Sequence, residues 1–92
     1  MKITYGPIKN QRNIAKRGLS FDRVVDLDWS DPLITMDNRQ DYGETRFIAQ
    51  MKLDGRLHIV VFTEVTDGLR IISFRKANKR EVNIYEQSTV DR

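Results

Sequence analysis

The chain has 92 residues, of which 39% are hydrophobic and 32% charged, and its formal net charge at pH 7 is +3. Its length allows one domain, residues 1–92, and the lack of a long apolar run or secretory signal excludes a membrane span, so we expect a cytoplasmic protein. It has no cysteine and one histidine, which excludes disulfides and thiolate metal sites, so we expect neither a metal nor another cofactor.

The first third of the chain predicts two helices. Pro7 suits the first position of a helix, and Gly18 suits its C-terminal end. Ser20 is a favourable N-cap for a second, shorter helix, whose apolar stripe begins at Phe21. Both helices are expected to end before a short strand at 33–36.

The centre of the chain predicts a β-hairpin. Asp54-Gly55 is the favoured pair for a two-residue turn, because the central residues of such a turn take positive φ. The turn sets a register in which Met51 faces His58. His58 is the only side chain whose ordinary pKa lies near neutrality, but its mid-strand position, away from the loops, favours a structural role over a catalytic one.

Another strand and a last helix complete the prediction. A turn at Asp67-Gly68 leads into a strand at 69–75, and from about residue 77 the apolar spacing becomes helical. The order of helix, helix, four mostly antiparallel strands and helix predicts an α+β domain with its helices packed on a small sheet.

Basic residues gather towards the two ends of the chain, around an acidic middle. Residues 1–19 contain five Lys or Arg side chains and no acid, and a second group follows where the last strand gives way to the last helix. The cations of this second group are Arg70, Arg75, Lys76, Lys79 and Arg80. If the fold brings the two groups together, they form one positive patch that attracts phosphates; otherwise they are solvated helix faces.

Three segments of the chain resemble the BrnT family of toxins. The first is YGPIKNQRNIAKRGLSF at 5–21, which has the family's order of Tyr, Pro, Lys, Asn, Lys, Gly, Ser and Phe. The second is GETRF at 43–47, which looks like the Gly-Glu-x-Arg segment that opens the family's second strand. The third and most specific is RIISFRKANKREVNIY at 70–85, which is similar to the family's closing signature.

The resemblance implies a toxin of a type II toxin–antitoxin system with a RelE-like fold. Such a toxin is an endoribonuclease that cuts RNA without a metal and so inhibits translation and growth. Its partner is a cognate antitoxin of the BrnA type, a ribbon-helix-helix protein, and operator DNA is bound only through the complex with the antitoxin. The resemblance also implies a toxin homodimer bridged by the antitoxin.

Two residues depart from the family pattern. Gly6 stands where the family usually has an acid, and Arg17 stands where it usually has histidine. If that histidine transfers protons, Arg17 cannot replace it, since an arginine pKa above about 12 prevents proton exchange near neutrality, although arginine still binds phosphate. The alternatives are therefore a catalytically weak or inactive relative that binds the antitoxin and regulates its operon, or, without the family, a general RNA- or DNA-binding domain.

Metal-free RNA cleavage needs a base for the 2′-hydroxyl proton, cations for the phosphorane and an acid for the leaving 5′-oxygen. Arg46, Arg70 and Arg75 lie on or beside neighbouring strands, so they can converge on one phosphate. Lys79 or Arg80 can join them from the first turn of the last helix, where unpaired backbone N–H groups also favour an anion.

Glu44 is the first choice for the base, because it precedes the strand that carries Arg46 and lies on the loop side; a solvated carboxylate is the alternative. Tyr85 can contact RNA or donate a proton through its hydroxyl while its ring packs the helix on the sheet. The structural alternative for the basic junction is that its arginines pair with Glu81, Glu44 or Glu64 and steady it.

The sequence thus predicts two sets of site residues. The catalytic set is Glu44, Arg46, Arg75 and Tyr85. The RNA-binding set is Lys9, Lys16, Arg17, Arg70, Lys76, Lys79 and Arg80. Among the aromatic residues, Tyr42 on the polar loop is a candidate for stacking on a base, whereas Trp29 is expected to anchor the core.

Overall fold

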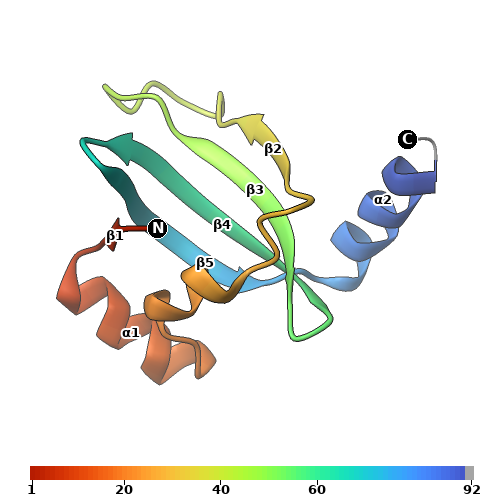
Figure 1. Ribbon diagram of the computed structural model, residues 1–92, viewed down its shortest axis with the longest axis horizontal. Coiled ribbons are helices and arrows are strands. Elements are labelled where there is room, and N and C mark those ends of the chain that lie inside the picture. The colour runs from red at the N-terminus through yellow and green to blue at the C-terminus, as the bar shows by residue number, and fades with distance from the viewer. Residues whose placement is uncertain (91–92) are drawn as a thin grey trace.

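The computed structural model describes residues 1–90 and arranges them as shown in Figure 1. In chain order the elements are β1 (Ile3–Thr4), α1 (Pro7–Arg17), the 3₁₀ helix η1 (Phe21–Asp26), β2 (Leu33–Met36), β3 (Phe47–Leu53), β4 (Arg56–Val65), β5 (Gly68–Lys76) and α2 (Lys79–Val90). The described strands form one sheet in the order β1-β5-β4-β3-β2, in which the β1–β5 pair is parallel and the others antiparallel. The predicted α+β fold is confirmed, but the sheet has five strands rather than four, and the second predicted helix is 3₁₀.

The caps of the N-terminal helices are those that the sequence predicts. Pro7 is the first residue of α1, and Gly18 ends it with a φ of 65° and a hydrogen bond from its N–H to the carbonyl oxygen of Ile14. The Ser20 side chain accepts a hydrogen bond from the N–H of Asp22 at 3.1 Å, which caps η1.

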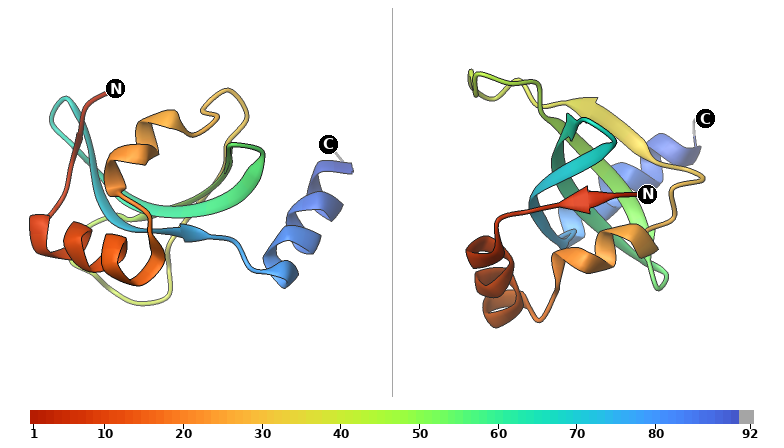
Figure 2. Two further views of the ribbon diagram at one scale, coloured as in Figure 1. Left: turned by 90° about the horizontal axis from the view of Figure 1, so that it is seen from below. Right: turned by 60° about the vertical axis from the view of Figure 1, so that its left-hand side comes forward.

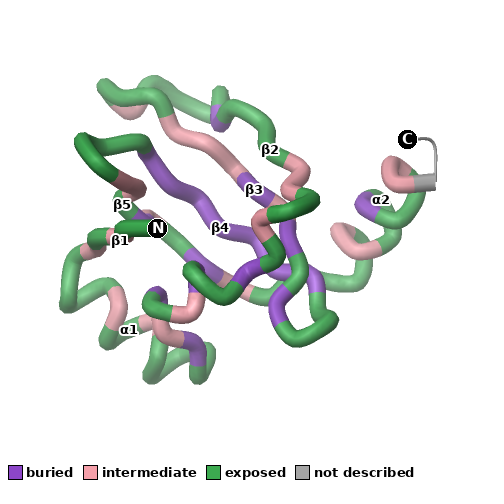
Figure 3. The backbone as a smooth tube through the Cα atoms, in the orientation of Figure 1, coloured by how far each residue is buried: buried purple, intermediate pink, exposed green. Residues whose placement is uncertain are grey.

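α1 lies beside the sheet next to β5, and its residues remain in contact with solvent (Figure 2). None of its described residues is buried, and the tube in Figure 3 is green or pink along α1. The exposed side chains include Ile8 and Ile14. Asn13 joins the helix to the body, because its Nδ2 donates to the carbonyl oxygens of Leu19 and Phe74, each at 2.9 Å. The cations of α1 are therefore held next to β5 without being buried.

One face of the sheet, the core face, carries the main hydrophobic core under η1. Its side chains are Ala49, Met51, Val60, Phe62, Ile71 and Phe74. Phe21 and Val24 of η1 complete the core, and both are almost fully buried. The indole Nε1 of Trp29 donates to the Val24 carbonyl oxygen at 3.0 Å, and its ring contacts Phe62 edge-on, so the predicted core anchor is confirmed.

The opposite face of the sheet, the open face, is covered at one end by α2. This face carries Ile48, Gln50, Ile59, Val61, Ser73 and Arg75. Tyr85 of α2 packs there in a buried cluster with Leu57, Ile59 and Ala77, so its ring packs as predicted. Figures 1 and 2 place α1 and α2 at opposite ends of the molecule, so the two helices do not join in one basic patch. Within residues 1–90, every helix is too short or too polar to be a membrane span.

The first hairpin turn agrees with the prediction, and the second differs by one residue. Asp54 and Gly55 take positive φ values of 51° and 79°, and Met51 pairs with His58 as predicted. The second turn is formed at residues 66–67, so the predicted turn at Asp67-Gly68 is wrong and Gly68 begins β5.

Gly68 is required for a reason other than the turn. A Cβ atom at this position would lie 2.2 Å from the carbonyl oxygen of Lys2, which accepts a hydrogen bond from the N–H of Leu69. The close approach of the N-terminal strand thus demands glycine here. β1 has two residues, too few to show a periodic pattern, which is why the sequence did not predict it.

Candidate active site

Glu44, Arg46 and Arg70 form one cluster at the end of the sheet beside the loop between β2 and β3. Glu44 Oε2 accepts hydrogen bonds from Arg46 Nε at 3.0 Å and from Arg70 Nη2 at 2.7 Å, and its Oε1 lies 2.8 Å from the same Arg70 nitrogen. Glu44 and Arg46 come from the loop that precedes β3, and Arg70 comes from β5. The structure therefore brings together the predicted base and two of the predicted cations, which we call the Glu44 cluster.

The two guanidinium groups control the protonation of Glu44. Hydrogen bonding to Arg46 is the largest cause that holds the pKa of Glu44 below its usual range. Desolvation opposes it, and the charge and hydrogen bonds of Arg70 add to the lowering. Glu44 is thus a carboxylate at neutral pH that can accept a proton. Its basicity is reduced for as long as both arginines remain bound to it.

Arg46 is also held by Tyr42. The guanidinium carbon lies 4.1 Å from the centre of the Tyr42 ring, which is a cation–π contact. The ring predicted to stack on a base already stacks on an arginine of the cluster, and its role towards RNA stays a prediction.

Arg75 belongs to a second cluster. Its Nη1 and Nη2 donate to Glu81 Oε1 and Oε2 at 2.8 and 2.9 Å, and the carboxylate raises the pKa of Arg75. Glu81 Oε1 also accepts from the N–H of Asn78 at 2.9 Å, and Asn78 Oδ1 accepts from the N–H of Glu81 at 2.8 Å. This reciprocal pair is a capping box that begins α2, so the predicted steadying of the strand–helix junction by an ion pair is confirmed for Arg75 and Glu81.

The two clusters are separated along the sheet. Arg70 pairs with Thr63 and Arg75 pairs with Ile59, and those β4 partners are four residues apart. At about 3.3 Å per residue, the backbones of the two arginines are about 13 Å apart. Arg46 and Arg70 meet at one anion, Glu44, whereas Arg75 is bound to Glu81, so the expected convergence of all three arginines on one phosphate is wrong for Arg75.

A cavity of about 270 Å³ on the open face adjoins the second cluster, and we call it the sheet-face pocket. It is lined by Arg39, Ile48, Gln50, Ile59, Val61, Ser73, Arg75, Glu81 and Ile84. Arg39 is a cation that the sequence analysis missed. Its Nε and Nη2 donate hydrogen bonds of 2.8 and 2.7 Å to the buried carboxylate of Asp37. The only sequence signal for this pairing is that Asp37 precedes Arg39 by two residues.

The predicted RNA-binding cations of α1 lie in a neighbouring cavity of about 220 Å³. Its lining includes Lys9, Arg12, Lys16 and Arg17 from the helix, and Ile72 and Ser73 from β5. Ser73 lines this cavity and the sheet-face pocket alike. The basic side of α1 is therefore continuous with the open face across β5.

The remaining predicted residues lie elsewhere. Lys79 and Tyr85 line a third cavity with Lys52 and Arg56, away from Glu44, and Tyr85 is only 7% exposed. Lys76 follows Arg75 in β5, so its side chain projects from the opposite face of the sheet. Arg80 is exposed in the first turn of α2. These residues are not gathered around the Glu44 cluster.

His58 has the structural role that its register predicts. The side chain is 3% exposed, its Nδ1 lies 2.8 Å from the carbonyl oxygen of Arg56, and its ring contacts Phe74. Burial lowers the pKa of His58, since desolvation disfavours the imidazolium. Among the described residues, no group of three or more His, Asp or Glu side chains is arranged to hold a metal ion.

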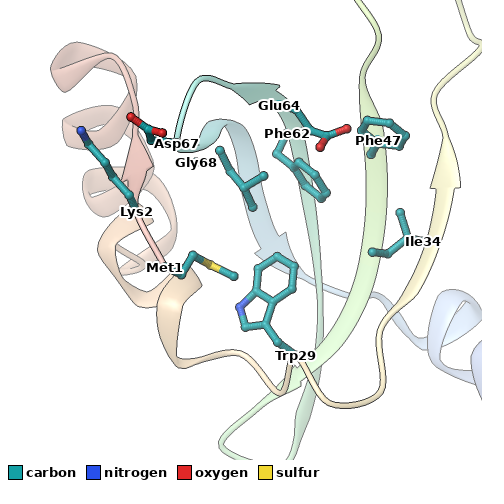
Figure 4. A pocket seen from close by; sticks show the side chains of 10 residues that line it. Met1, Lys2, Trp29, Ile34, Phe47, Phe62, Glu64, Asp67 and Gly68 are labelled. Atoms are coloured by element: carbon teal, nitrogen blue, oxygen red, sulfur yellow. The ribbon is translucent and has the colours of Figure 1, made fainter.

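A further cavity has a different chemistry. It encloses about 550 Å³ on the core-face side, and Figure 4 shows its apolar walls of Trp29, Phe47 and Phe62 with the acids Glu64 and Asp67 at its rim. Acidic groups repel the phosphates of RNA, and apolar walls offer them no hydrogen bonds. The cations needed for RNA chemistry lie on the open face and at the end of the sheet.

A protein-family model described as the ribonuclease toxin BrnT of a type II toxin–antitoxin system matches residues 5–81. The chain belongs to this family. The matched BrnT region contains the Glu44 cluster, the sheet-face pocket up to Glu81, and the cations of α1. As a type II toxin the protein has a cognate antitoxin as its partner, and as a ribonuclease toxin it acts on RNA. A comparison with curated proteins gave no significant match.

Proposed function

We propose that this BrnT-family toxin is a cytoplasmic, metal-independent endoribonuclease whose chemistry takes place at the Glu44 cluster. The observation that carries the proposal is a single carboxylate bound by two guanidinium groups, Arg46 and Arg70, within 3.0 Å. This arrangement supplies a proton acceptor and two cations at one place. Both are needed to cleave a phosphodiester by attack of its own 2′-hydroxyl.

The proposed reaction begins when a phosphate of the RNA takes the place of Glu44 as the acceptor for Arg46 and Arg70. Loss of these hydrogen bonds raises the pKa of Glu44 towards its usual value, which makes the carboxylate a better base. Glu44 then takes the proton of the 2′-hydroxyl, and the 2′-oxygen bonds to phosphorus. As the bond from phosphorus to the 5′-oxygen breaks, that oxygen takes a proton from water, leaving a 2′,3′-cyclic phosphate and a 5′-hydroxyl. The hydroxide left by that water takes the proton held by Glu44, which restores the carboxylate.

Arg75 has a supporting part in this proposal, since it lies at the other end of the open face. It binds a flanking phosphate, while Lys9, Lys16 and Arg17 of α1 attract the RNA strand towards β5. Lys76, Lys79 and Arg80 contact more distant phosphates. Tyr85 contacts RNA through its hydroxyl, while its ring stays packed in the α2 cluster. It has no part in the proton transfer at Glu44, since the two residues line different cavities.

The test is expression of the chain without its antitoxin, followed by cleavage of purified RNA in the presence of EDTA. We expect growth arrest and loss of intact RNA for the parent, and a decrease of about 10²–10⁴-fold in cleavage rate for Glu44→Gln, the range typical of a lost general base. Arg23→Ala is the matched control, because Arg23 is an ion-paired surface arginine on η1. Equal rates for Glu44→Gln and the parent would overturn the assignment of the base, and dependence on added metal would overturn metal independence.

The second candidate function is a catalytically weak or inactive relative that binds the antitoxin and regulates the operon. Arg17 supports it, because this residue stands where the family usually has histidine and lies beside β5 rather than near Glu44. The test is Arg17→His. A toxic variant beside a harmless parent would establish this second function, whereas a toxic parent would exclude it.

For the partner, we propose a ribbon-helix-helix antitoxin of the BrnA type that bridges a toxin homodimer and carries the complex to operator DNA. The candidate is the product of the adjacent reading frame, co-expressed with the toxin. We expect it to relieve growth arrest and co-purify with two copies of the toxin, and the complex, unlike the toxin alone, to bind the operator. Relief of toxicity without co-purification would contradict direct neutralisation.

A further inference from the structure

The sheet-face pocket combines an apolar floor with polar groups at its sides. Ile48, Ile59 and Val61 form the floor from β3 and β4, and the guanidinium groups of Arg39 and Arg75 lie at the sides. A phosphate alone would fit poorly on such a floor, because it would lose water without gaining hydrogen bonds. A flat, weakly polar group attached to a phosphate matches both parts of the pocket.

Two polar side chains in this pocket are uncommitted. In the described part of the chain, neither the Gln50 amide nor the Ser73 hydroxyl makes a hydrogen bond. Every buried side-chain nitrogen or oxygen among these residues has a partner, so the two groups are not buried and face the open space of the pocket. Gln50 lies between Leu33 and Ile59 in the register of the sheet, and an extended strand holds its backbone in place. Its amide therefore presents a donor and an acceptor to whatever enters.

The two cations of the pocket are each bound by a carboxylate. Asp37 binds Arg39 through two hydrogen bonds, and Glu81 binds Arg75 through two more. A planar guanidinium that is held in place offers a face for a nucleobase to stack on, and its remaining N–H groups can bind a phosphate. The pocket thus has what one unpaired nucleotide needs. The guanidinium groups offer stacking faces and hydrogen-bond donors for its phosphate, the floor is apolar, and an amide can hydrogen-bond the edge of its base.

We propose that the sheet-face pocket is a nucleobase subsite in which Gln50 reads adenine. This inference rests on the proposed function and adds a sequence preference to it. The amide of glutamine matches the donor at N6 and the acceptor at N7 of adenine, which no other base presents in that order on its Hoogsteen edge. The Ser73 hydroxyl on β5 assists in binding the base, and it lies where the RNA strand would pass from the α1 cations into the pocket.

The test uses 2′-O-methyl oligonucleotides, which cannot be cleaved, so that binding is measured separately from catalysis. The two probes are a uridine decamer and the same decamer with one central adenine, and their binding is followed by fluorescence anisotropy. We expect the parent to bind the adenine probe about tenfold more tightly. Gln50→Leu, which keeps the size of the side chain, should abolish this preference, and the uridine decamer should bind within about twofold of the parent.

Gln50→Glu is the more specific variant, since a carboxylate accepts from N4 of cytosine and should shift the preference to a cytosine probe. Gln11→Leu on the exposed surface of α1 is the control and should leave the preference unchanged. Preserved adenine preference in Gln50→Leu, or equal binding of all probes by the parent, would overturn the subsite. A parent that cleaves RNA without base preference would refute the subsite alone, and one that prefers adenine without cleaving would refute the proposed chemistry alone.

Discussion

The arginines of the sheet and the cations of α1 differ in how they are held. Arg46, Arg70 and Arg75 are each bound to a carboxylate at 3.0 Å or less. In contrast, within the described part of the chain the side chains of Lys9, Lys16 and the other cations of α1 make no hydrogen bond or ion pair. Both groups are positive, but only the first has a defined geometry.

This difference indicates two uses for the same charge. Stabilising a transition state requires donors already placed where charge develops, because a mobile side chain loses entropy when it is ordered. Attracting a polyanion requires only a positive potential, which mobile lysines provide equally well. We therefore expect the sheet arginines to govern the rate of cleavage and the α1 cations to govern association with RNA.

Among the cations, the largest effect is expected at Arg70. Arg70→Ala removes a donor of the Glu44 cluster and should lower the cleavage rate at saturating RNA by about 10²–10³-fold, the usual consequence of losing one such donor. The measurement is the initial rate with a defined RNA substrate. Arg23→Ala removes the same charge from η1 and should stay within about twofold of the parent. Equal losses in both variants would mean that total charge, not placement, sets the rate.

The next largest effect concerns the cap that holds Glu81 against Arg75. Asn78→Ala removes the side-chain acceptor for the N–H of Glu81 and should lower the free energy of unfolding by about 1 kcal/mol. For a chain of this size that corresponds to a fall in Tm of about 4–8 °C. Asn83→Ala, at an exposed position within α2, is the control and should be neutral or slightly stabilising, because alanine favours helix. Urea denaturation of both variants checks the prediction, and equal destabilisation would contradict the cap.

The dependence of stability on pH should reveal the fixed ion pair. Hydrogen bonding to Arg75 lowers the pKa of Glu81, so this carboxylate contributes stability above its ordinary pKa, near 4.3, and the contribution is lost as pH falls through the lower folded-state value. Glu81→Gln should thus be less stable than the parent at pH 7, and the difference should shrink on acidification. Glu86→Gln controls for net charge. The free energies of unfolding are measured by urea denaturation. A difference between Glu81→Gln and the parent that stays constant from pH 7 to pH 3 would contradict the Arg75–Glu81 ion pair.

Local sequence signals were sufficient for the fold where neighbouring residues decide it. Pro7 and Gly18 bound α1, and Asp54-Gly55 set the β3–β4 register from which the faces of the sheet follow. The signals failed where a distant segment decides. β1 pairs with β5 only because Gly68 leaves room for the carbonyl oxygen of Lys2, and no periodicity within two residues could indicate that contact.

The site was predictable to the same extent. Glu44 and Arg46 are neighbours in sequence, and their meeting with Arg70 follows from strands that pair in order. The direction in which α2 leaves the sheet cannot be read from its residues, and that direction removes Lys79 from the predicted cluster. Gln50 carried no signal, since its importance depends on facing the same side of the sheet as Arg75.

The smallest effect is expected for a single α1 cation. The measurement is the binding constant for single-stranded RNA at several salt concentrations. Lys16→Ala should reduce the slope of its logarithm against the logarithm of the salt concentration by about 0.7, the contribution of one phosphate contact. The cleavage rate at saturating RNA should not change, and stability should stay within about 0.5 kcal/mol, because Lys16 is exposed. Lys2→Ala, next to the acids of the apolar cavity, is the control and should leave the slope unchanged. A large fall in the rate of Lys16→Ala at saturating RNA would show that α1 takes part in the chemistry, and the division between fixed and mobile charge would then be wrong.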